Sequence, residues 1–296
     1  MKRLAVEVLA IFGPTGTGKT VIAESVADAI ASEVVSADAM QVYRGLPILT
    51  NQPERPTRLV AIRELAEEMS VGEYAPLAHA AIDELVADRG SAVVAGGAGL
   101  YFRAALSELG VPSRPEPGVR ERWEDVYDRD PARAYGELRA RDPAAATLVH
   151  ANDRKRVVRA LELAEAGGSL VPGANRLWGS ETRRPTLVFG LVVSRARLQQ
   201  RIERRTAAMF EREVVAEVRR ALASGPVSRT ATSALGLREV AELPADEAKA
   251  AIVRRTLRYA AYQRKWMRRI PGVVMIDAEP PPDEVANAIL EVARAR

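Results

Sequence analysis

Residues 13–20 read Gly-Pro-Thr-Gly-Thr-Gly-Lys-Thr, a complete phosphate-binding loop of the G-x-x-x-x-G-K-T type. An apolar run at residues 6–12 predicts a buried strand before the loop, and an alanine-rich amphipathic stretch predicts a helix after it. The backbone N–H groups of such a loop face one concavity, where the helix N-terminus adds partial positive charge. A glycine-rich turn that binds nothing is the alternative, but strand, loop and helix together favour a polyphosphate site. We expect the phosphates to contact Gly13, Thr15, Gly16, Thr17, Gly18, Lys19 and Thr20.

Side chains in and near the loop indicate more specific chemistry. Lys19 can neutralise the outer phosphate, and the Thr20 hydroxyl can hold Mg²⁺. A loop that hydrolyses nucleoside triphosphates needs a second carboxylate at a neighbouring strand end, yet the apolar run at 92–95 is followed by glycines. The only carboxylate that the sequence places just past a core strand is Asp38, after the run at 34–36. We expect Asp38 at the C-terminal edge of the sheet, as a metal ligand or general base, with a turn cap as the alternative.

Two groups of arginines are candidate anion contacts. Arg201 and Arg205 are four residues apart in a predicted helix over 195–224, so they project together and can clamp a diphosphate. Pairing with acidic neighbours on a solvated helix is the alternative for that pair. Asp153 is a predicted N-cap, and the three cations at 154–156 then oppose the helix dipole. An anionic partner at that helix start would offset the repulsion.

Apolar runs that alternate with helical patterns predict an α/β fold with a doubly wound parallel P-loop sheet. We expect strands at 6–12, 34–36, 92–95 and 186–193, and helices at 20–31, 75–88, 195–224 and 246–269. Residues 113–185 have helical patterns and no convincing strand, so they predict a helical insertion that contacts a polyanion. The core is then made of residues 1–112 and 186–296.

The net charge of +4 is distributed unevenly. Residues 1–112 carry 9 basic and 14 acidic side chains, whereas residues 113–296 carry 34 and 25. This asymmetry favours a polyanionic partner, although only 5 of the 43 basic residues are lysine, as in arginine-rich proteomes. Residues 250–276 hold seven basic side chains and no acidic one. Helical spacing puts Val253, Leu257, Ala260 and Met267 on a core face and Arg254, Arg258, Tyr262, Lys265 and Arg269 on another, which favours phosphate contact.

Composition excludes several other classes. The chain has no cysteine, so disulfides and thiolate metal sites are excluded. Its basic, apolar start looks like a signal peptide, but Glu7 interrupts the apolar part and the phosphate loop stands where cleavage would occur. No apolar run approaches the roughly 20 residues of a membrane span. We expect a cytoplasmic monomer that does not bind membranes.

Three N-terminal segments, at 13–20, 36–45 and 96–101, resemble signatures of tRNA dimethylallyltransferases. Further matches follow in order over nearly the whole chain, at 117–120, 142–143, 152–153, 159–162, 201–209 and 256–266. The resemblance implies transfer of a dimethylallyl group from dimethylallyl diphosphate, bound with Mg²⁺, to N6 of adenosine 37 beside a tRNA anticodon. It implies that Asp38 accepts the N6 proton, with Arg201 and Arg205 completing the catalytic set. It implies tRNA contacts by Asp38, Ala39, Met40, Gln41, Ala98, Arg120, Asp153, Arg154, Lys155, Arg156 and Arg159.

The chain departs from that family's usual residues at several positions. Ala39 and Ala98 stand where Ser and Thr are usual, and Gln52 stands in place of a lysine. Ala261 and Tyr262 replace the Lys-Arg that usually precedes Gln263, and residues 57–65 replace a segment that contains histidine. Each departure removes a polar or cationic group near the expected active site or RNA.

Three other functions compete with this one. A small-molecule kinase with a phosphate loop would bind ATP tightly, but it leaves the basic helix face unexplained. A prenyltransferase of free adenine nucleotides needs no contact with RNA, so the cations at 154–159 argue against it. A non-catalytic RNA-binding protein would keep the loop as a scaffold only.

Overall fold

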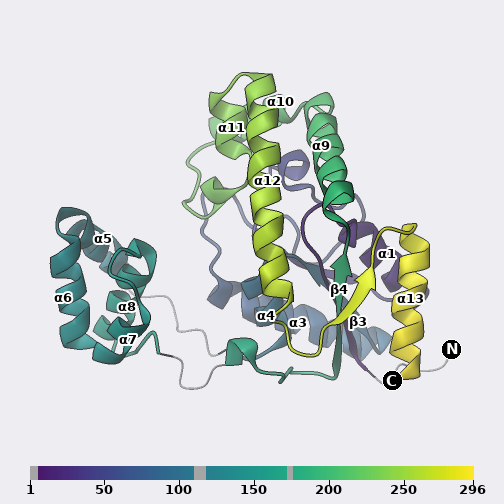
Figure 1. Ribbon diagram of the computed structural model, residues 1–296, viewed down its shortest axis with the longest axis horizontal. Coiled ribbons are helices and arrows are strands. Elements are labelled where there is room, and N and C mark those ends of the chain that lie inside the picture. The colour runs from purple at the N-terminus through teal and green to yellow at the C-terminus, as the bar shows by residue number, and fades with distance from the viewer. Residues whose placement is uncertain (1–5, 110–117, 172–175) are drawn as a thin grey trace. The chain divides into compact units, whose positions relative to one another are not determined.

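The structure, a computed structural model, describes residues 6–109, 118–171 and 176–296. The chain forms two compact units (Figure 1). One unit contains Met1–Leu109 and Leu177–Arg296, and the other contains Gly110–Arg176. The segment 177–185, which the sequence assigned to the insertion, therefore groups with the first unit. The expected start of the insertion at residue 113 lies outside the described residues.

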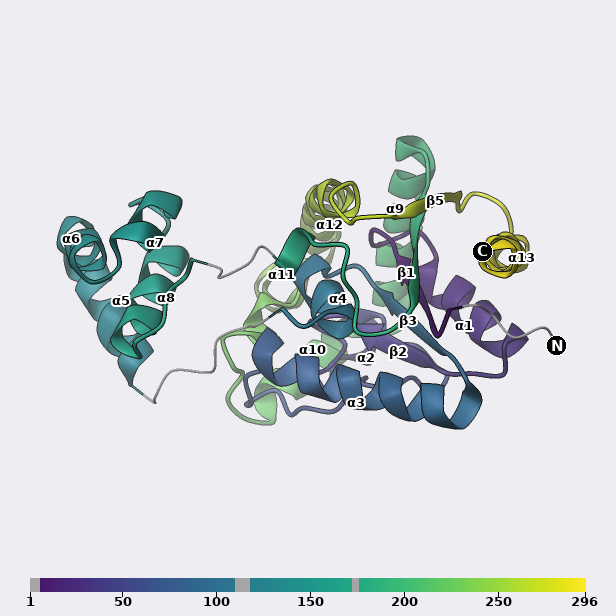
Figure 2. The same ribbon diagram turned by 90° about the horizontal axis from the view of Figure 1, so that it is seen from below.

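The first unit is built on a five-stranded parallel sheet in the order β2-β3-β1-β4-β5 (Figure 2). The predicted doubly wound α/β fold is confirmed, and the four predicted strands are all present. The fifth strand was missed although residues 273–276 are all apolar, because this short run directly follows Pro271-Gly272 and was not assigned to an element. In the structure its residues alternate between half-buried and exposed. The strands are β1 (Val8–Phe12), β2 (Val34–Ala37), β3 (Ala92–Gly96), β4 (Thr186–Val192) and β5 (Val274–Asp277).

Alternate residues of β1, β3 and β4 point into two separate hydrophobic cores. On β1, Ala10 and Phe12 face one core, whereas Leu9 and Ile11 face the other. Helices α3 (Val71–Arg89) and α4 (Gly99–Leu106) cover the first face, and α1 (Lys19–Ala29) and α13 (Pro282–Ala295) cover the second (Figure 2). Burial on both faces explains why β1 reads as an uninterrupted apolar run.

The predicted helix over 195–224 is wrong as a single element. It consists of α9 (Arg195–Glu211) and α10 (Val214–Ala223), separated at Arg212 and Glu213. Glu213 has a φ of 64°, a left-handed conformation that interrupts the helix without glycine or proline. The other predicted long helix is confirmed as α12 (Ala245–Met267). Short elements complete this unit: α2 (Pro47–Thr50), α11 (Leu237–Glu242) and 3₁₀ turns at Arg176–Trp178 and Ala231–Ser233.

The second unit is helical, as predicted, and has its own core around Trp123, Leu138 and Leu161. Aspartate side chains at 130, 142 and 153 cap three of its helices by accepting backbone N–H groups. The cap at Asp153 was expected from the sequence. The helices are α5 (Val119–Arg129), α6 (Pro131–Arg141), α7 (Pro143–Leu148) and α8 (Arg154–Glu165).

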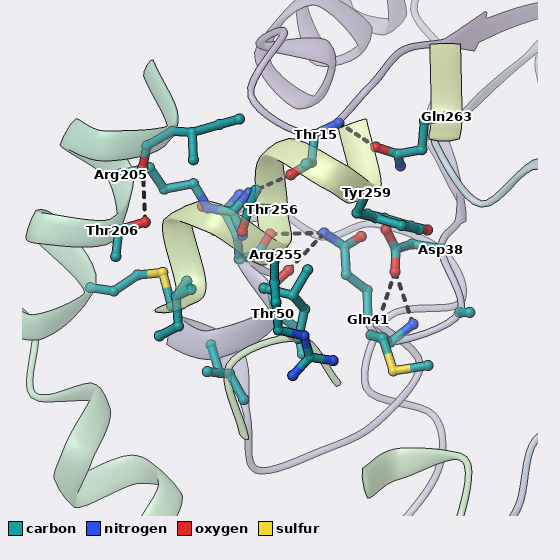
Figure 3. A pocket seen from close by; sticks show the side chains of 18 of the residues that line it. Thr15, Asp38, Gln41, Thr50, Arg205, Thr206, Arg255, Thr256, Tyr259 and Gln263 are labelled. Atoms are coloured by element: carbon teal, nitrogen blue, oxygen red, sulfur yellow. Dashed lines mark hydrogen bonds between the residues drawn. The ribbon is translucent and has the colours of Figure 1, made fainter. Parts of the chain in front are cut away.

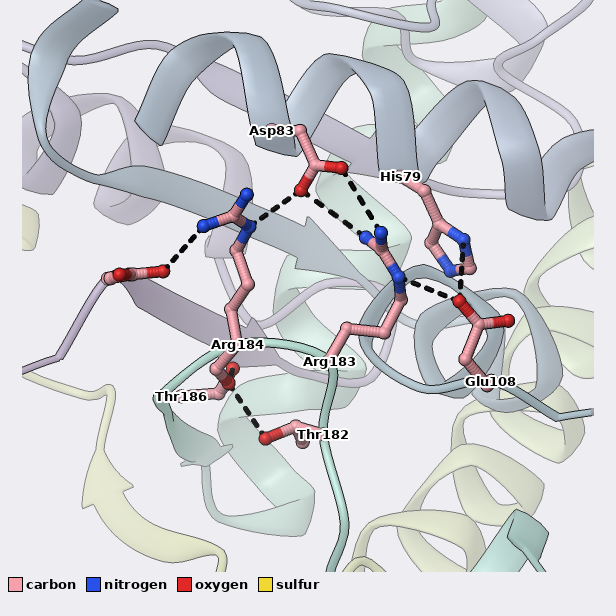
Figure 4. Close-up of polar contacts among 8 residues, drawn as sticks. His79, Asp83, Glu108, Thr182, Arg183, Arg184 and Thr186 are labelled. Carbon is pink, nitrogen blue, oxygen red and sulfur yellow. Dashed lines mark hydrogen bonds and ion pairs between the residues drawn. The ribbon is translucent and has the colours of Figure 1, made fainter. Parts of the chain in front are cut away.

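Two adjacent arginines hold the segment that leads into β4 (Figure 4). Arg184 donates to Asp83 on α3 at 2.6 Å and to Glu7, just before β1, at 2.8 Å. Arg183 donates to the other oxygen of Asp83 at 3.1 Å and to Glu108 at 2.8 Å. Because these contacts join α3 to the start of both strands, they fix β4 beside β1 and so fix α9, which follows β4, near the phosphate loop.

Candidate active site

The loop between β1 and α1 has the backbone conformation of a phosphate cradle. Gly16 and Gly18 have φ values of 87° and 88°, which side chains other than glycine rarely adopt. Thr17 is buried and its hydroxyl donates to the carbonyl of Pro14 at 2.8 Å, which closes the loop on itself. Helix α1 begins at Lys19, so its free N–H groups lie where the loop ends.

Helix α9 brings both predicted arginines to this loop. Arg205 Nη1 donates to Thr15 Oγ1 at 2.8 Å, and Arg201 Nη1 donates to the carbonyl of Thr17 at 3.0 Å. Arg201 also donates to the carbonyl of Ala278 at 3.1 Å, after β5. Within the described residues neither arginine forms an ion pair, so the alternative of pairing with acidic neighbours on α9 does not hold there. Arg205 lines the cavity described below, whereas Arg201 supports the loop from α9.

The site concentrates positive charge in a poorly solvated place. Burial lowers the pKa of Lys19, the nearby Asp38 carboxylate raises it, and Arg205 lowers it further. Burial also lowers the pKa of Arg205, again opposed by Asp38. A downward shift means that the charged forms lack compensation. A bound polyanion would supply that compensation, which is the electrostatic signature expected of a diphosphate site.

Asp38 lies just after β2 and faces the same cavity as Lys19 and Thr20. Its Oδ1 accepts the backbone N–H groups of Met40 at 2.8 Å and Gln41 at 3.3 Å. The turn-cap alternative therefore holds for one carboxylate oxygen. No hydrogen bond within the described residues reaches Oδ2, so this oxygen can serve a ligand.

Gln41 is fixed by its surroundings. Its Oε1 accepts from the hydroxyl of Ser36 at 2.9 Å, and its Nε2 donates to the carbonyls of Asn51 at 2.8 Å and Thr50 at 3.5 Å. The Asn51 contact occupies one amide hydrogen, the Thr50 carbonyl lies at the distance limit of a hydrogen bond, and one lone pair of Oε1 is left. Gln41 can therefore accept a hydrogen bond from a ligand amine.

These side chains line one cavity of about 470 Å³ (Figure 3). Lys19, Thr20, Asp38 and Arg205 contribute charge or hydrogen bonds, and Ala39, Met40 and Gln41 line it as well. Figure 3 shows Arg205 and Thr206 on one side, Asp38 and Gln41 on the other, and residues of α12 between them. The volume suits a small molecule. Apolar side chains complete the wall: Leu49, Ile202, Met209, Leu235 and Ile252.

Gln263 on α12 is a site residue with no role predicted from the sequence. Its Oε1 accepts the backbone N–H of Thr15 at 2.8 Å, and its Nε2 donates to the carbonyl of Gly97 at 2.9 Å. A Cβ at Gly97 would lie 2.4 Å from Nε2, so only glycine fits beneath this amide. The available signal was a lone glutamine inside a helix full of basic residues, which is not enough to identify a loop contact.

Glu217 on α10 was also missed. This buried carboxylate accepts the N–H groups of Ile48 at 2.7 Å and Leu49 at 2.8 Å, at the start of α2. It therefore holds the cavity wall that includes Thr50 and Asn51. Burial raises the pKa of Glu217, while the two backbone N–H groups lower it in part.

The remaining candidates lie outside the cavity lining. Ala98 is a half-buried residue at the start of α4. The sequence predicts Asp38 as the only acid just past a core strand, but Asp277 also stands at a strand end, that of β5. Asp277 is on an edge strand and does not line the cavity. Arg120 and the cluster at 153–159 belong to the second unit.

Carboxylates of the second unit already offset part of the charge at the start of α8. Arg154 donates to both oxygens of Asp128, each at 2.6 Å, and Arg120 pairs with Glu124 at 3.0 Å. Arg159 pairs with Glu162 at 3.0 Å. Asp128 therefore already compensates the charge of Arg154, so the repulsion by the helix dipole does not by itself require an outside anion at that residue. The repulsion still applies to the exposed Lys155 and Arg156, which form no ion pair within the described residues.

Oxygen donors for Mg²⁺ are present but few. The described residues contain no cluster of three or more His, Asp or Glu that could enclose a metal ion. Mg²⁺ usually takes only one or two protein oxygens and completes its octahedron with water and substrate phosphates. The Thr20 hydroxyl and the Asp38 carboxylate line the same cavity, so the donor set fits that habit.

A family model described as IPP transferase matches residues 41–270, and one described as isopentenyl transferase matches residues 6–63. The chain is 38% identical to a tRNA dimethylallyltransferase of Streptomyces coelicolor, over 91% of this chain and 89% of the relative. It is 28% identical to a solved tRNA isopentenylpyrophosphate transferase of Bacillus halodurans, with a TM-score of 0.67 over 97% and 94% of the two chains.

A second solved structure has the same fold at lower identity. It is a eukaryotic dimethylallyltransferase acting on tRNA, 24% identical, with a TM-score of 0.73 over 93% of this chain and 74% of that one. Along the described ranges of the present chain, every helix is too short or too polar to cross a membrane.

Proposed function

This chain belongs to the IPP transferase family, and we propose that it transfers a dimethylallyl group from dimethylallyl diphosphate to N6 of adenosine 37 in tRNA. We further propose that it works as a monomer in the cytoplasm. The observation that carries the proposal is a single cavity lined by Thr15, Lys19 and Thr20 of the phosphate loop. The same cavity is lined by Arg205 and Arg258, which like Lys19 form no ion pair among the described residues, and by Asp38, whose Oδ2 is free.

The reaction forms one C–N bond and breaks one C–O bond. The lone pair of N6 attacks C1 of the dimethylallyl group, and diphosphate leaves with the electron pair of the C–O bond. The N6 proton passes to Asp38 Oδ2, which the backbone bonds to Oδ1 hold in place. A general base helps because the exocyclic amine is a poor nucleophile.

The reaction also requires stabilisation of the negative charge that develops on the leaving diphosphate. Lys19, Arg205 and the backbone of the phosphate loop are aimed at one place before any ligand binds, which lowers the cost of reorganisation. Mg²⁺ held by the Thr20 hydroxyl would add positive charge there. Burial lowers the pKa of Lys19 and of Arg205, and a bound anion would raise both again because it compensates their charge.

The acceptor base must leave its stack to reach the cavity, which costs a few kcal/mol. Contacts to the RNA backbone can offset that cost, and exposed cations supply them on two elements: Lys155 and Arg156 on α8, and the outer face of α12. These contacts distinguish the proposal from a prenyltransferase of free nucleotides.

A direct assay tests the proposal. Purified protein is incubated with Mg²⁺, dimethylallyl diphosphate and unmodified tRNA that reads U-starting codons, and the digested RNA is analysed for N6-dimethylallyladenosine by mass spectrometry. AMP and ADP serve as competing acceptors, and ATP with no prenyl donor tests for a kinase. Prenylated AMP without prenylated RNA would contradict the proposal, as would the absence of any prenylated product.

A further inference from the structure

Three aromatic side chains of α12 and one from the 3₁₀ turn at Arg176–Trp178 form a continuous row. Tyr259 and Tyr262 have ring centroids 6.5 Å apart with near-parallel planes, and Tyr262 and Trp266 are 6.5 Å apart edge to face. Trp178 packs on Trp266 with a centroid distance of 4.7 Å, and the guanidinium of Arg269 covers Trp178 at 3.8 Å. We define these four aromatic residues as the aromatic row.

One end of the row is rigidly anchored and the other is open. Trp266 lies flat against Gly99 at the start of α4, where an added Cβ would come within 2.2 Å of the indole. Tyr262 in contrast is 55% exposed, although a tyrosine ring on a helix gains from burial. An exposed ring on a rigid base is a surface on which a flat partner can stack at low entropic cost.

The charges around the row select the partner. Arg258 and Lys265 flank Tyr262 on the exposed face, and within the described residues neither has a carboxylate in ion-pair distance. No acidic residue occurs from 250 to 276. An aromatic ring between unpaired cations is the arrangement that binds single-stranded nucleic acid, where bases stack and phosphates pair.

The position of the row relative to the cavity indicates which part of the RNA would contact Tyr262. Tyr259 lines the cavity that contains Asp38, and Tyr262 follows one helical turn later on the outside. Tyr262 therefore lies one helical turn from the wall of the cavity that would receive the target base. We propose that the Tyr262 ring is a stacking platform for the anticodon-loop base that adjoins the target adenosine. This inference rests on the proposed function.

A double-mutant cycle between protein and RNA tests the platform. The ligand is an unmodified anticodon stem-loop, intact or with one abasic nucleotide on either side of the target adenosine, and the Kd is measured by fluorescence anisotropy. Loss of one base–aromatic stack weakens binding by about 5- to 100-fold. We expect that loss for Tyr262→Leu on intact RNA, and no further loss when the stacked base is abasic. Tyr262→Phe, which keeps the ring, should bind like the unmodified protein.

Controls separate stacking from charge and from folding. Arg258→Gln should lower the salt dependence of log Kd by about one, and its effect should multiply with that of the abasic nucleotide. Circular dichroism and Tm should be unchanged for Tyr262→Leu because the side chain is exposed. If Tyr262→Leu weakens binding by the same factor on intact RNA and on both abasic RNAs, the platform is excluded. It is also excluded if Tyr262→Leu binds intact RNA with unchanged Kd.

Failure of the stacking platform can be distinguished from failure of the proposed function. The double-mutant cycle measures binding alone, so it gives a result even if no prenylated RNA forms. Prenylation by the unaltered protein without coupling at Tyr262 would leave the function in place and remove the platform. Coupling at Tyr262 without any prenylation would support the platform and contradict the proposed function.

Discussion

Arg205 on α9 donates a hydrogen bond of 2.8 Å to the hydroxyl of Thr15 in the phosphate loop, 190 residues earlier in the chain. The bond holds a half-buried guanidinium in the cavity that Lys19 also lines, with no ion-pair partner among the described residues. We expect Arg205→Gln to lower kcat by about 10²- to 10³-fold, the cost of losing one aimed donor at developing charge. The measurement is steady-state prenylation of tRNA at saturating donor.

The control for this change is Arg204→Gln on the same helix, because Arg204 is exposed and does not line the cavity. It should leave kcat within a factor of about two. Equal losses for the two variants would show that α9 contributes only general positive charge.

Asp38 combines two roles that Asp38→Asn can separate. The amide keeps an acceptor for the N–H groups of Met40 and Gln41 but cannot take a proton at neutral pH. We expect at least a 10²-fold loss of kcat with tRNA affinity retained, measured by single-turnover kinetics and anisotropy. Asp38→Ala should lose both turnover and some thermal stability. Near-full turnover by Asp38→Asn would exclude the carboxylate as the base.

The exposed cations of α8 should contribute to RNA binding through charge alone. Replacing Lys155 and Arg156 by Gln should weaken tRNA binding and reduce the slope of log Kd against log salt by about two. Arg154→Gln should instead lower the stability of the second unit, because it breaks the pair with Asp128. Titrations at several salt concentrations check the slopes. Unchanged slopes would place the RNA elsewhere.

Glu217 predicts a pH dependence of stability. Burial raises its pKa in the folded state above the ordinary 4.5, so the folded protein keeps this proton to higher pH than the unfolded chain. Its contribution to stability is therefore full below about 4.5 and is lost as pH rises through the folded pKa. Glu217→Gln does not titrate and leaves one N–H of α2 without an acceptor, which costs about 1–3 kcal/mol.

Urea denaturation of both proteins between pH 4.5 and 8 provides the check. The difference in free energy of unfolding, unaltered protein minus Glu217→Gln, should decrease as the pH rises. A difference that stays constant would mean that the carboxylate does not titrate differently in the two states.

The phosphate loop, its flanking strand and helix, and the position of Asp38 could be predicted because their signals are local. The glycines at 16 and 18 and the buried run of β1 depend only on neighbouring residues. The break at Glu213 could not be predicted, since it occurs between charged residues with no glycine or proline.

Contacts between residues far apart in the sequence also could not be predicted. Gln263 bonds to Thr15 across 248 residues, and no helical periodicity indicates such a contact. Arg154 finds Asp128 on another helix, so its charge looked unpaired in the sequence. The second unit's fold, not its composition, decides which cations of α8 are left for a ligand.

The adjacency of Tyr262 and Gln263 has a consequence for how this protein can diverge. Successive residues of a helix point about 100° apart, so Gln263 lies under the phosphate loop while Tyr262 lies in solvent. Substitution at Tyr262 leaves both hydrogen bonds of Gln263 in place. Residues of α12 that face the RNA can therefore change during evolution, whereas Gln263, which supports the phosphate loop, remains constrained.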